Sequence, residues 1–131
     1  MYVDASAFLK LYLDEPEREE CRELVCGASE PTTARLALVE VRRRLALELE
    51  GEQLAPARAQ FARDWDEFTI VEVDDAACQR AAVIAEATGV RSLDALHLGA
   101  AEPLRGAVPF LTYDRRQADA ARALGWTVYG A

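Results

Sequence analysis

The sequence predicts an α/β domain with a mainly parallel β-sheet. Short apolar stretches alternate along the chain with segments in which apolar side chains recur at helical spacing. No internal repeat, low-complexity segment or linker interrupts this alternation, so residues 1–131 are expected to form one domain. Asp4 directly follows the first of the apolar stretches and Asp114 follows another after one residue, at the strand ends where open α/β sheets bind ligands.

The expected strands are short and apolar. They span Met1–Val3, Pro31–Thr33, Thr69–Val73, Val108–Thr112 and Trp126–Tyr129. Helices are expected between them, bounded mostly by glycine or proline, at Ala5–Leu13, about Glu17–Cys26, about Ala34–Glu50, from Pro56 to the strand at Thr69, Ala76–Thr88, Leu93–Ala101 and Arg115–Leu124. Ser92 is expected to cap the helix that follows it, and Asp74 or Asp75 the helix before that.

Composition narrows the classes of protein. With 51% apolar residues, the 131-residue chain can bury a substantial core. Fifteen basic and 23 acidic residues give a net charge of -8, which argues against a broad basic face for nucleic acid. A nucleic-acid substrate would instead be held by local arginines and bound cations. The sequence contains neither an 18-residue apolar run nor a charged-then-apolar leader, so we expect no membrane insertion and no secretion.

The cysteines and the histidine exclude some metal sites. Cys21, Cys26 and Cys78 are odd in number and lack the spacing of zinc ligands, which predicts reduced thiols and a cytoplasmic protein. His97 is the only histidine, so a His-rich metal site is also excluded.

Four carboxylates, Asp4, Glu40, Asp94 and Asp114, are candidates for a functional site. Each of them also has an ordinary structural interpretation. Asp4 and Asp114 each lie between a strand and a helix, where aspartate commonly caps a helix N-terminus. Asp94 lies in the first turn of its helix, where the helix dipole favours negative charge.

For Glu40 the ordinary interpretation is a surface ion pair with Arg43 or Arg44, three and four residues further on. This interpretation is weaker, because Leu36 and Val39 predict that the first half of this helix face is buried. A carboxylate there is costly unless it is paired or binds a metal.

One interpretation explains all four acids together. Carboxylates without a histidine or cysteine among them form a hard oxygen-ligand site, which suits Mg²⁺ or Mn²⁺. Four negative charges balance two divalent cations, so one or two ions are expected. Such ions activate water and stabilise charge during phosphodiester hydrolysis.

Several segments carry a family resemblance: Met1–Ala7, Thr33 with Glu40–Val41, Ser92–His97, Leu111–Asp114 and Ala120–Gly125. In this order they resemble a PIN-domain ribonuclease, specifically a VapC-type toxin of a bacterial or archaeal toxin–antitoxin pair. The resemblance implies a five-stranded parallel sheet with helices on both faces and Mg²⁺- or Mn²⁺-dependent endonucleolytic cleavage of RNA. It also implies an acidic pocket formed by Asp4, Glu40, Asp94 and Asp114. Ser6 and Thr112 match positions near that pocket, where a hydroxyl either orients a ligand or forms a local helix or turn hydrogen bond.

In the predicted mechanism, Asp4 is the central metal ligand, Glu40 and Asp94 join it, and Asp114 completes the site through water. Metal-activated water then attacks the phosphorus, so no lysine or histidine has to act as the base. His97, three residues after Asp94, is interpreted as a satisfied, partly buried histidine rather than a catalytic one. The candidates for contacts with the RNA backbone, each of which also suits a solvated surface, are Arg42, Arg43, Arg44, Arg115 and Arg116.

Two other enzyme classes need residues that this chain lacks. A phosphatase of the haloacid-dehalogenase type needs a second aspartate where this chain has Ser6, and a receiver domain needs an acidic pair and a late lysine. A catalytically silent PIN fold that only binds RNA or a protein remains an alternative. The expected partners are a cognate antitoxin and RNA. A homodimer is a further possibility, through Tyr12, Trp65 and Phe68, although core packing is the more common role of such aromatic residues.

Overall fold

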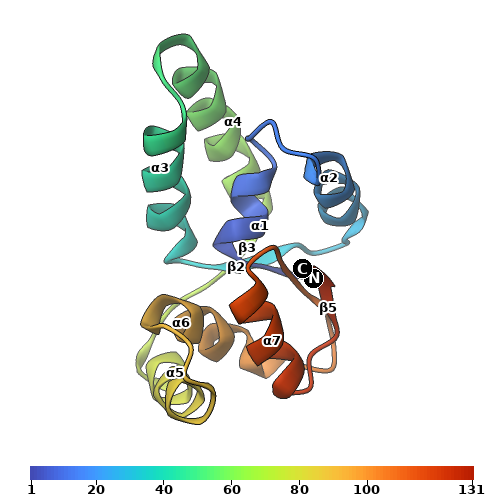
Figure 1. Cartoon of the computed structure of the whole chain (residues 1–131), viewed down its shortest axis with the longest axis vertical. Helices are drawn as coiled ribbons and strands as arrows, with labels where there is room; N and C mark the ends of the chain where they lie inside the picture. The colour runs from blue at the N-terminus through green and yellow to red at the C-terminus, as the bar shows by residue number, and fades with distance from the viewer.

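The computed structural model describes residues 1–131 as a five-stranded parallel sheet with helices on both faces (Figure 1). The strand order is β3-β2-β1-β4-β5, and every pairing is parallel. The strands are β1 (Tyr2–Val3), β2 (Thr32–Ala34), β3 (Thr69–Val71), β4 (Phe110–Thr112) and β5 (Val128–Gly130). The expected fold class is therefore confirmed.

The helices form two layers, with the sheet between them (Figure 1). One layer contains α1 (Ala5–Lys10), α2 (Arg18–Gly27), α3 (Ala37–Glu48) and α4 (Leu54–Glu67). The other contains α5 (Asp75–Thr88), α6 (Ser92–Ala101) and α7 (Arg115–Ala123). Two short 3-10 turns, Gly51–Gln53 and Glu102–Leu104, precede α4 and follow α6. No helix is long and apolar enough to cross a membrane.

Alternation along the central strands supplies a separate core to each layer. Tyr2 of β1 pairs with Phe110 of β4, and both side chains join the core under α5–α7. Val3 pairs with Leu111, and these next residues join the core under α1–α4. Because successive side chains of a strand point to opposite faces, two residues per strand are enough to anchor both layers.

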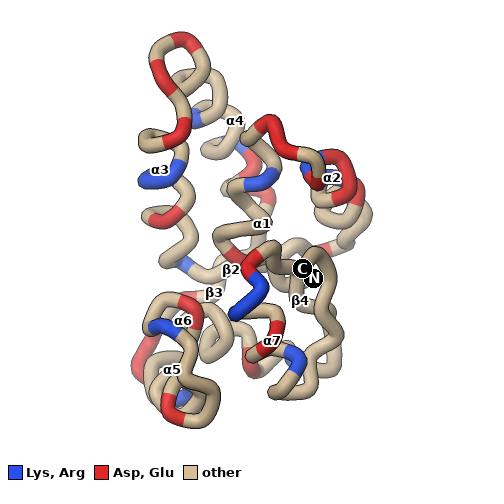
Figure 2. The backbone as a smooth tube through the Cα atoms, viewed as in Figure 1, with Lys and Arg blue, Asp and Glu red and all other residues tan.

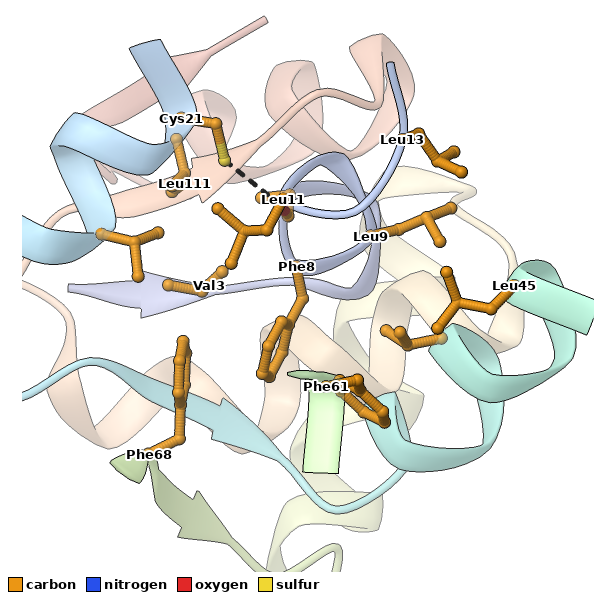
Figure 3. Close-up of a cluster of buried hydrophobic side chains, with 13 residues drawn as sticks. Val3, Phe8, Leu9, Leu11, Leu13, Cys21, Leu45, Phe61, Phe68 and Leu111 are labelled. Atoms are coloured by element: carbon orange, nitrogen blue, oxygen red, sulfur yellow. Dashed lines mark hydrogen bonds between the residues drawn. The ribbon is translucent and has the colours of Figure 1, made fainter. Parts of the chain in front are cut away.

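The core under α1–α4 is centred on Phe8 of α1 (Figure 3). Its ring is fully buried, stacks on Phe68 with ring centroids 4.3 Å apart, and meets Phe61 edge-on at 5.0 Å. Tyr12 and Trp65 pack against the same cluster. These aromatic residues therefore have the core-packing role. The cluster fixes α1 on the sheet, and with α1 the residue Asp4 that precedes it.

The other layer depends on a close approach of α5 and α6. A Cβ atom added to Gly99 would lie 2.6 Å from the Ala77 carbonyl oxygen and 2.7 Å from the Ala81 nitrogen. Only glycine therefore allows α6 to pack this closely on the small residues of α5. Arg80 also donates from Nε to the Gly99 carbonyl oxygen at 2.9 Å. This packing fixes the position of α6, which carries Asp94 and His97.

Several local expectations were wrong. α3 begins at Ala37 rather than Ala34, because Ala34 pairs with Val71 in the sheet. Ser92 is the first residue of α6 and not its cap; Arg91 occupies the N-cap position without a side-chain hydrogen bond. The expected cap at Asp74 is confirmed, since its side chain accepts from the Ala77 nitrogen at 2.9 Å.

Four of the five strands are also shorter than expected, whereas β2 keeps its length and lies one residue later. β3 ends at Val71 and β5 begins at Val128; Trp126, two residues earlier, is buried in the core. α1 ends at Lys10, and the apolar residues after it, Leu11 and Leu13, are buried without being helical.

Candidate active site

The connections of the sheet reverse direction between β1 and β4, and we call the carboxyl-terminal edge of these two strands the crevice. The chain runs from β1 to β2 and β3 on one side, and then crosses to β4 and β5 on the other. In a parallel sheet, the carboxyl ends of the strands at such a reversal are the usual place for a ligand. Asp4 directly follows β1, and Asp114 follows β4 after one intervening residue. The Asp4 nitrogen donates to the Leu111 carbonyl oxygen at 3.1 Å, which holds the two strand ends side by side.

Asp4 is the most buried and most constrained acid of the site. It is only 1% exposed. Oδ1 accepts from Ser6 Oγ at 2.7 Å and from the Ala7 nitrogen at 2.9 Å, and Oδ2 accepts from Thr112 Oγ1 at 2.6 Å. A carboxylate has about four lone-pair positions, so these three donors leave about one for a further ligand. Asp4 is thus a helix cap, as its sequence position suggested, with residual capacity to bind.

The hydroxyls that hold Asp4 are themselves held by the backbone. The Tyr113 nitrogen donates to Ser6 Oγ at 2.9 Å, and the Asp114 nitrogen donates to Thr112 Oγ1 at 3.1 Å. Ser6 Oγ and Thr112 Oγ1 are 3.2 Å apart. Burial raises the pKa of Asp4 above its ordinary value. The charge of His97 and the hydrogen bonds that Asp4 accepts from Thr112, Ala7 and Ser6 oppose this rise. The loop after β4 therefore fixes the orientation of a buried carboxylate.

Asp114 caps α7 while keeping one oxygen uncommitted. Its Oδ1 accepts from the Gln117 nitrogen at 3.1 Å, and its Oδ2 has no partner. Gln117 in turn donates from Nε2 to the Asp94 carbonyl oxygen at 3.4 Å, which links α7 to the start of α6. The capping interpretation of Asp114 is thus correct, and the side chain remains exposed beside the crevice.

Asp94 lies within the electrostatic field of the other three acids. Burial is the largest cause that raises its pKa, followed by Asp114, with smaller contributions from Asp4 and Glu40, while His97 lowers it. Asp94 lies in the first turn of α6 and is half-buried. The fold therefore brings carboxylates from β1, α3, α6 and the β4–α7 connection within electrostatic reach of one another.

Glu40 does not form the surface ion pair that its sequence position allowed. Its Oε1 lies 2.7 Å from His97 Nε2, whereas Arg44 pairs with Glu48. The expected burial was also partly wrong: the buried stripe of α3 is formed by Ala37, Val41 and Leu45, and Val39 is 69% exposed. The side chain of Glu40 is 23% exposed, so it borders the crevice rather than the core.

The four acids suit a hydrated hard cation better than a dehydrated one. No group of three or more side chains is positioned to ligate one ion directly. Mg²⁺ normally keeps several waters and uses only one or two protein carboxylates. The remaining lone pair of Asp4 and the free oxygen of Asp114 fit this mode, because neither is taken by a hydrogen bond within the protein.

Arginines without carboxylate partners flank the site. Arg115 and Arg116 occupy the first turn of α7, where the helix dipole disfavours cations, and neither forms a salt bridge. Figure 2 shows the basic segment at the start of α7 next to acidic positions. Arg91 and Arg116 line a hollow of about 410 Å³ together with Asp94. Sequence reasoning missed Arg91; its place just before the helix of Asp94 was the available signal. Arg42 and Arg43 are exposed and without ion pairs, and Arg44 is engaged by Glu48.

Comparison with known proteins agrees with the fold. Residues 1–123 match the family model for the PIN domain. Ribonuclease VapC47 of Mycobacterium tuberculosis (strain CDC 1551 / Oshkosh) is 34% identical over 131 residues, covering 96% of this chain and 93% of that protein. The crystal structure of FitAcB from Neisseria gonorrhoeae has a TM-score of 0.72 at 15% identity, covering 98% of this chain and 96% of that one. A toxin–antitoxin complex from Klebsiella pneumoniae has a TM-score of 0.65 at 13% identity, covering 86% and 85%.

Proposed function

This chain belongs to the PIN-domain family, and on that premise we propose that it is a Mg²⁺- or Mn²⁺-dependent endoribonuclease, the toxin of a toxin–antitoxin pair. The observation that carries this proposal is Asp4, a buried carboxylate at the point where the strand order reverses, held by three donors. Three further carboxylates border the same crevice. A structural cap needs only one acceptor, so the additional hydroxyl donors and the surrounding acids are better explained by a ligand site.

The residues of the crevice have different tasks in this proposal. Asp4 is the central ligand, because its orientation is fixed on both oxygens. Glu40 and Asp94 join it from α3 and α6, and Asp114 contributes through water. Because no three of these side chains are positioned to ligate one ion directly, some of the contacts of Glu40 and Asp94 run through waters of the cation. When bound, the cation would polarise the phosphoryl group and lower the pKa of a water molecule. Ser6 and Thr112 act through Asp4 by holding its carboxylate in one orientation.

Unpaired arginines supply the contacts to the RNA backbone. In a chain of net charge -8, RNA is repelled at long range and needs local cations. Arg115 and Arg116 begin α7 immediately after Asp114, and Arg91 and Arg116 line the hollow that contains Asp94. Arginine binds phosphate bidentately, so these three guanidinium groups can position a phosphodiester beside the acids. Arg42 and Arg43 extend the same role along α3.

The test of this function is cleavage of RNA by the purified protein with Mg²⁺ or Mn²⁺. EDTA should stop the reaction. Because water and not the ribose 2′-hydroxyl is the nucleophile, the products should carry no 2′,3′-cyclic phosphate, and a 2′-deoxy substitution at the cleaved position should be tolerated. Mass spectrometry of the fragments measures both features.

Two results would contradict the proposal. Cyclic phosphate ends indicate a metal-independent contaminant, and an absence of cleavage on a broad RNA panel at saturating Mn²⁺ favours a silent binding module.

Replacement of Arg116 by Gln should lower cleavage at low RNA concentration and weaken the salt dependence of cleavage, whereas Arg58→Gln, on the exposed face of α4, should change neither.

The partner we propose is an antitoxin that covers two surfaces. One is the acidic crevice, where an arginine or lysine of the antitoxin can replace the cation. The other is a groove of about 910 Å³ between α1, α2 and α4, lined by apolar residues such as Leu11, Val25 and Phe68 with arginines at its edges. Arg18 Nε there is buried without a hydrogen-bond partner, which leaves a donor for an incoming acceptor.

The spacing of these surfaces constrains the antitoxin. Asp4 and Leu11 lie at opposite ends of the first helical segment, about 10 Å apart along its axis at 1.5 Å per residue. An extended chain advances roughly 3.3 Å per residue, so the basic residue must lie at least about three positions along the antitoxin chain from the apolar anchor.

A competition experiment tests this arrangement. Saturating antitoxin should lower both the affinity for Mn²⁺ and the rate of RNA cleavage. Gln60→Trp, which places a bulky ring in the groove from α4, should weaken antitoxin binding while leaving free-toxin cleavage unchanged. Arg58→Trp is the matched control, because Arg58 is exposed on the same helix and does not line the groove. Unchanged Mn²⁺ affinity in the complex would mean that the antitoxin inhibits elsewhere.

A further inference from the structure

A buried chain of hydrogen bonds connects β1 with α6 and α3. Tyr2 OH lies 2.8 Å from His97 Nδ1, and His97 Nε2 lies 2.7 Å from Glu40 Oε1. Tyr2 is fully buried and His97 is 1% exposed, while the side chain of Glu40 is 23% exposed at the crevice. The chain therefore leads from the core to one acid of the site.

The chemistry of the three groups fixes the direction of the hydrogen bonds. The Glu40 carboxylate can only accept, so His97 Nε2 carries a proton and donates it. In the neutral form of the imidazole, Nδ1 is then an acceptor and Tyr2 OH donates to it; in the charged form, which lowers the pKa of Asp4 and Asp94, Nε2 still donates to Glu40. Tyr2 therefore selects the tautomer of His97 that can hold Glu40.

The orientation of the imidazole is also fixed by packing. The Tyr2 ring stacks on Phe110 with centroids 5.0 Å apart, and it meets the His97 ring edge-on at 75°. α6 itself is fixed by its close contact with α5 at Gly99. The donor on Nε2 consequently points in one direction, and Glu40 is held from outside its own helix.

This contact joins the two helix layers next to the site. α3 and α6 lie on opposite sides of the sheet (Figure 1), and the carboxylates of Glu40 and Asp94 come from these two helices. Asp94 and His97 are three residues apart, so one face of α6 carries both an acid of the site and the group that holds the acid of α3. His97 occupies Oε1 of Glu40 and leaves Oε2 without a partner.

We propose that His97, oriented by Tyr2, is a positioning residue that holds Glu40 so that its second oxygen serves the cation site. This inference rests on the proposed function. A purely structural histidine would fill space and satisfy its nitrogens. His97 instead donates its outer N–H to a partly exposed carboxylate that water could otherwise solvate. His97 thus orients Glu40 in the way that hydrogen-bonded partners orient metal ligands generally.

Two replacements of similar size separate positioning from packing. In His97→Gln the side-chain amide nitrogen reaches about the place of Nε2 and can still donate to Glu40. In His97→Asn the amide reaches only the place of Nδ1, so the contact with Tyr2 can persist and the contact with Glu40 is lost. We expect His97→Asn to weaken Mn²⁺ binding by roughly 10–100-fold, as is usual for loss of such a partner, and His97→Gln to retain most of the affinity. Electron paramagnetic resonance of free Mn²⁺ measures this without reference to activity.

Two further variants test the route. Tyr2→Phe removes the hydroxyl that selects the tautomer, so it should weaken Mn²⁺ binding less than His97→Asn does. In a Glu40→Gln background, His97→Asn should cause little additional loss, because its effect is transmitted through Glu40. Circular dichroism and thermal melts in EDTA verify that each variant is folded.

The outcomes are distinct. The inference is overturned if His97→Asn binds Mn²⁺ as tightly as the unsubstituted protein, or if His97→Gln and His97→Asn lose equal affinity with equally lowered melting temperatures. Additive losses in the Glu40→Gln background also contradict it. If the unsubstituted protein itself fails to bind Mn²⁺, the proposed function fails and the positioning role fails with it.

Discussion

Asp4→Asn is expected to lower the rate of RNA cleavage by at least about 100-fold, because a central ligand is replaced by a neutral amide. Stabilisation of transition-state charge by a bound cation is worth several kcal/mol, and each 1.36 kcal/mol corresponds to a factor of ten. Single-turnover cleavage at saturating Mn²⁺ measures this loss, and binding of Mn²⁺ should weaken in parallel.

The fold should survive this substitution. The amide oxygen of Asn can still accept from Ser6 and from the Ala7 nitrogen, and its NH₂ group can donate to Thr112 Oγ1. The buried negative charge disappears at the same time, which removes the cost that raises the pKa of Asp4. Circular dichroism should therefore be unchanged, so the loss of activity reports on chemistry.

Asp66→Asn provides the control for Asp4→Asn. Asp66 is exposed on α4, lines neither the hollow beside Asp94 nor the groove between α1, α2 and α4, and forms no salt bridge. This control should cleave RNA at the unsubstituted rate. Undiminished cleavage by Asp4→Asn would refute the assignment of Asp4 as a ligand.

The fold was predictable because its signals are local. Each strand is a short apolar run, and the residues that follow Val3 and Thr112 signal a helix start through capping aspartates. The same acids mark the carboxyl edge of the sheet, so strand position alone predicted that Asp4 and Asp114 would lie near each other. The predicted boundaries of helices and strands were wrong where pairing between strands determines them. Ala34, for example, joins the sheet although its neighbours suit a helix.

The environment of Glu40 was harder to predict, because it depends on a contact 57 residues away in sequence. Helical spacing offered Arg43 and Arg44 as partners, and nothing local indicates that His97 of another helix takes that place. The misjudged burial of Val39 has the same origin: the face of α3 that is covered is set by α1 and α4, not by the apolar residues of α3 alone. Long-range packing, rather than composition, determines how this acid is used.

Asp94→Asn is expected to reverse the order of stability between variant and unsubstituted protein when metal is added. In EDTA, burial and the neighbouring carboxylates raise the folded-state pKa of Asp94. A raised carboxyl pKa means that stability is fully present below the ordinary value near 3.8 and is lost as pH rises through the folded-state value. Near neutral pH the full cost of the ionised Asp94 side chain in the folded state applies. Removing this charge should raise the free energy of unfolding by about 1 kcal/mol or less, since water screens the half-exposed side chain.

In Mn²⁺ the expected difference in stability between Asp94→Asn and the unsubstituted protein has the opposite sign. A ligand at about 100 times its Kd stabilises a native protein by about 2.7 kcal/mol, and a Kd weakened tenfold or a hundredfold leaves about 1.4 or 0.4 kcal/mol at the same concentration. The unsubstituted protein should therefore melt lower than Asp94→Asn in EDTA and higher in Mn²⁺. Well below pH 3.8, where Asp94 is protonated in both states, the difference in EDTA should vanish.

The opposite result has a definite physical meaning. A negative charge in the first turn of a helix is favourable by about 0.3–1 kcal/mol, so a purely structural Asp94 would lose this contribution on substitution. Asp94→Asn would then melt lower than the unsubstituted protein in EDTA, and the shift produced by Mn²⁺ would be the same for both. That pair of melts would remove Asp94 from the ligand set and leave the cation to Asp4, Glu40 and Asp114.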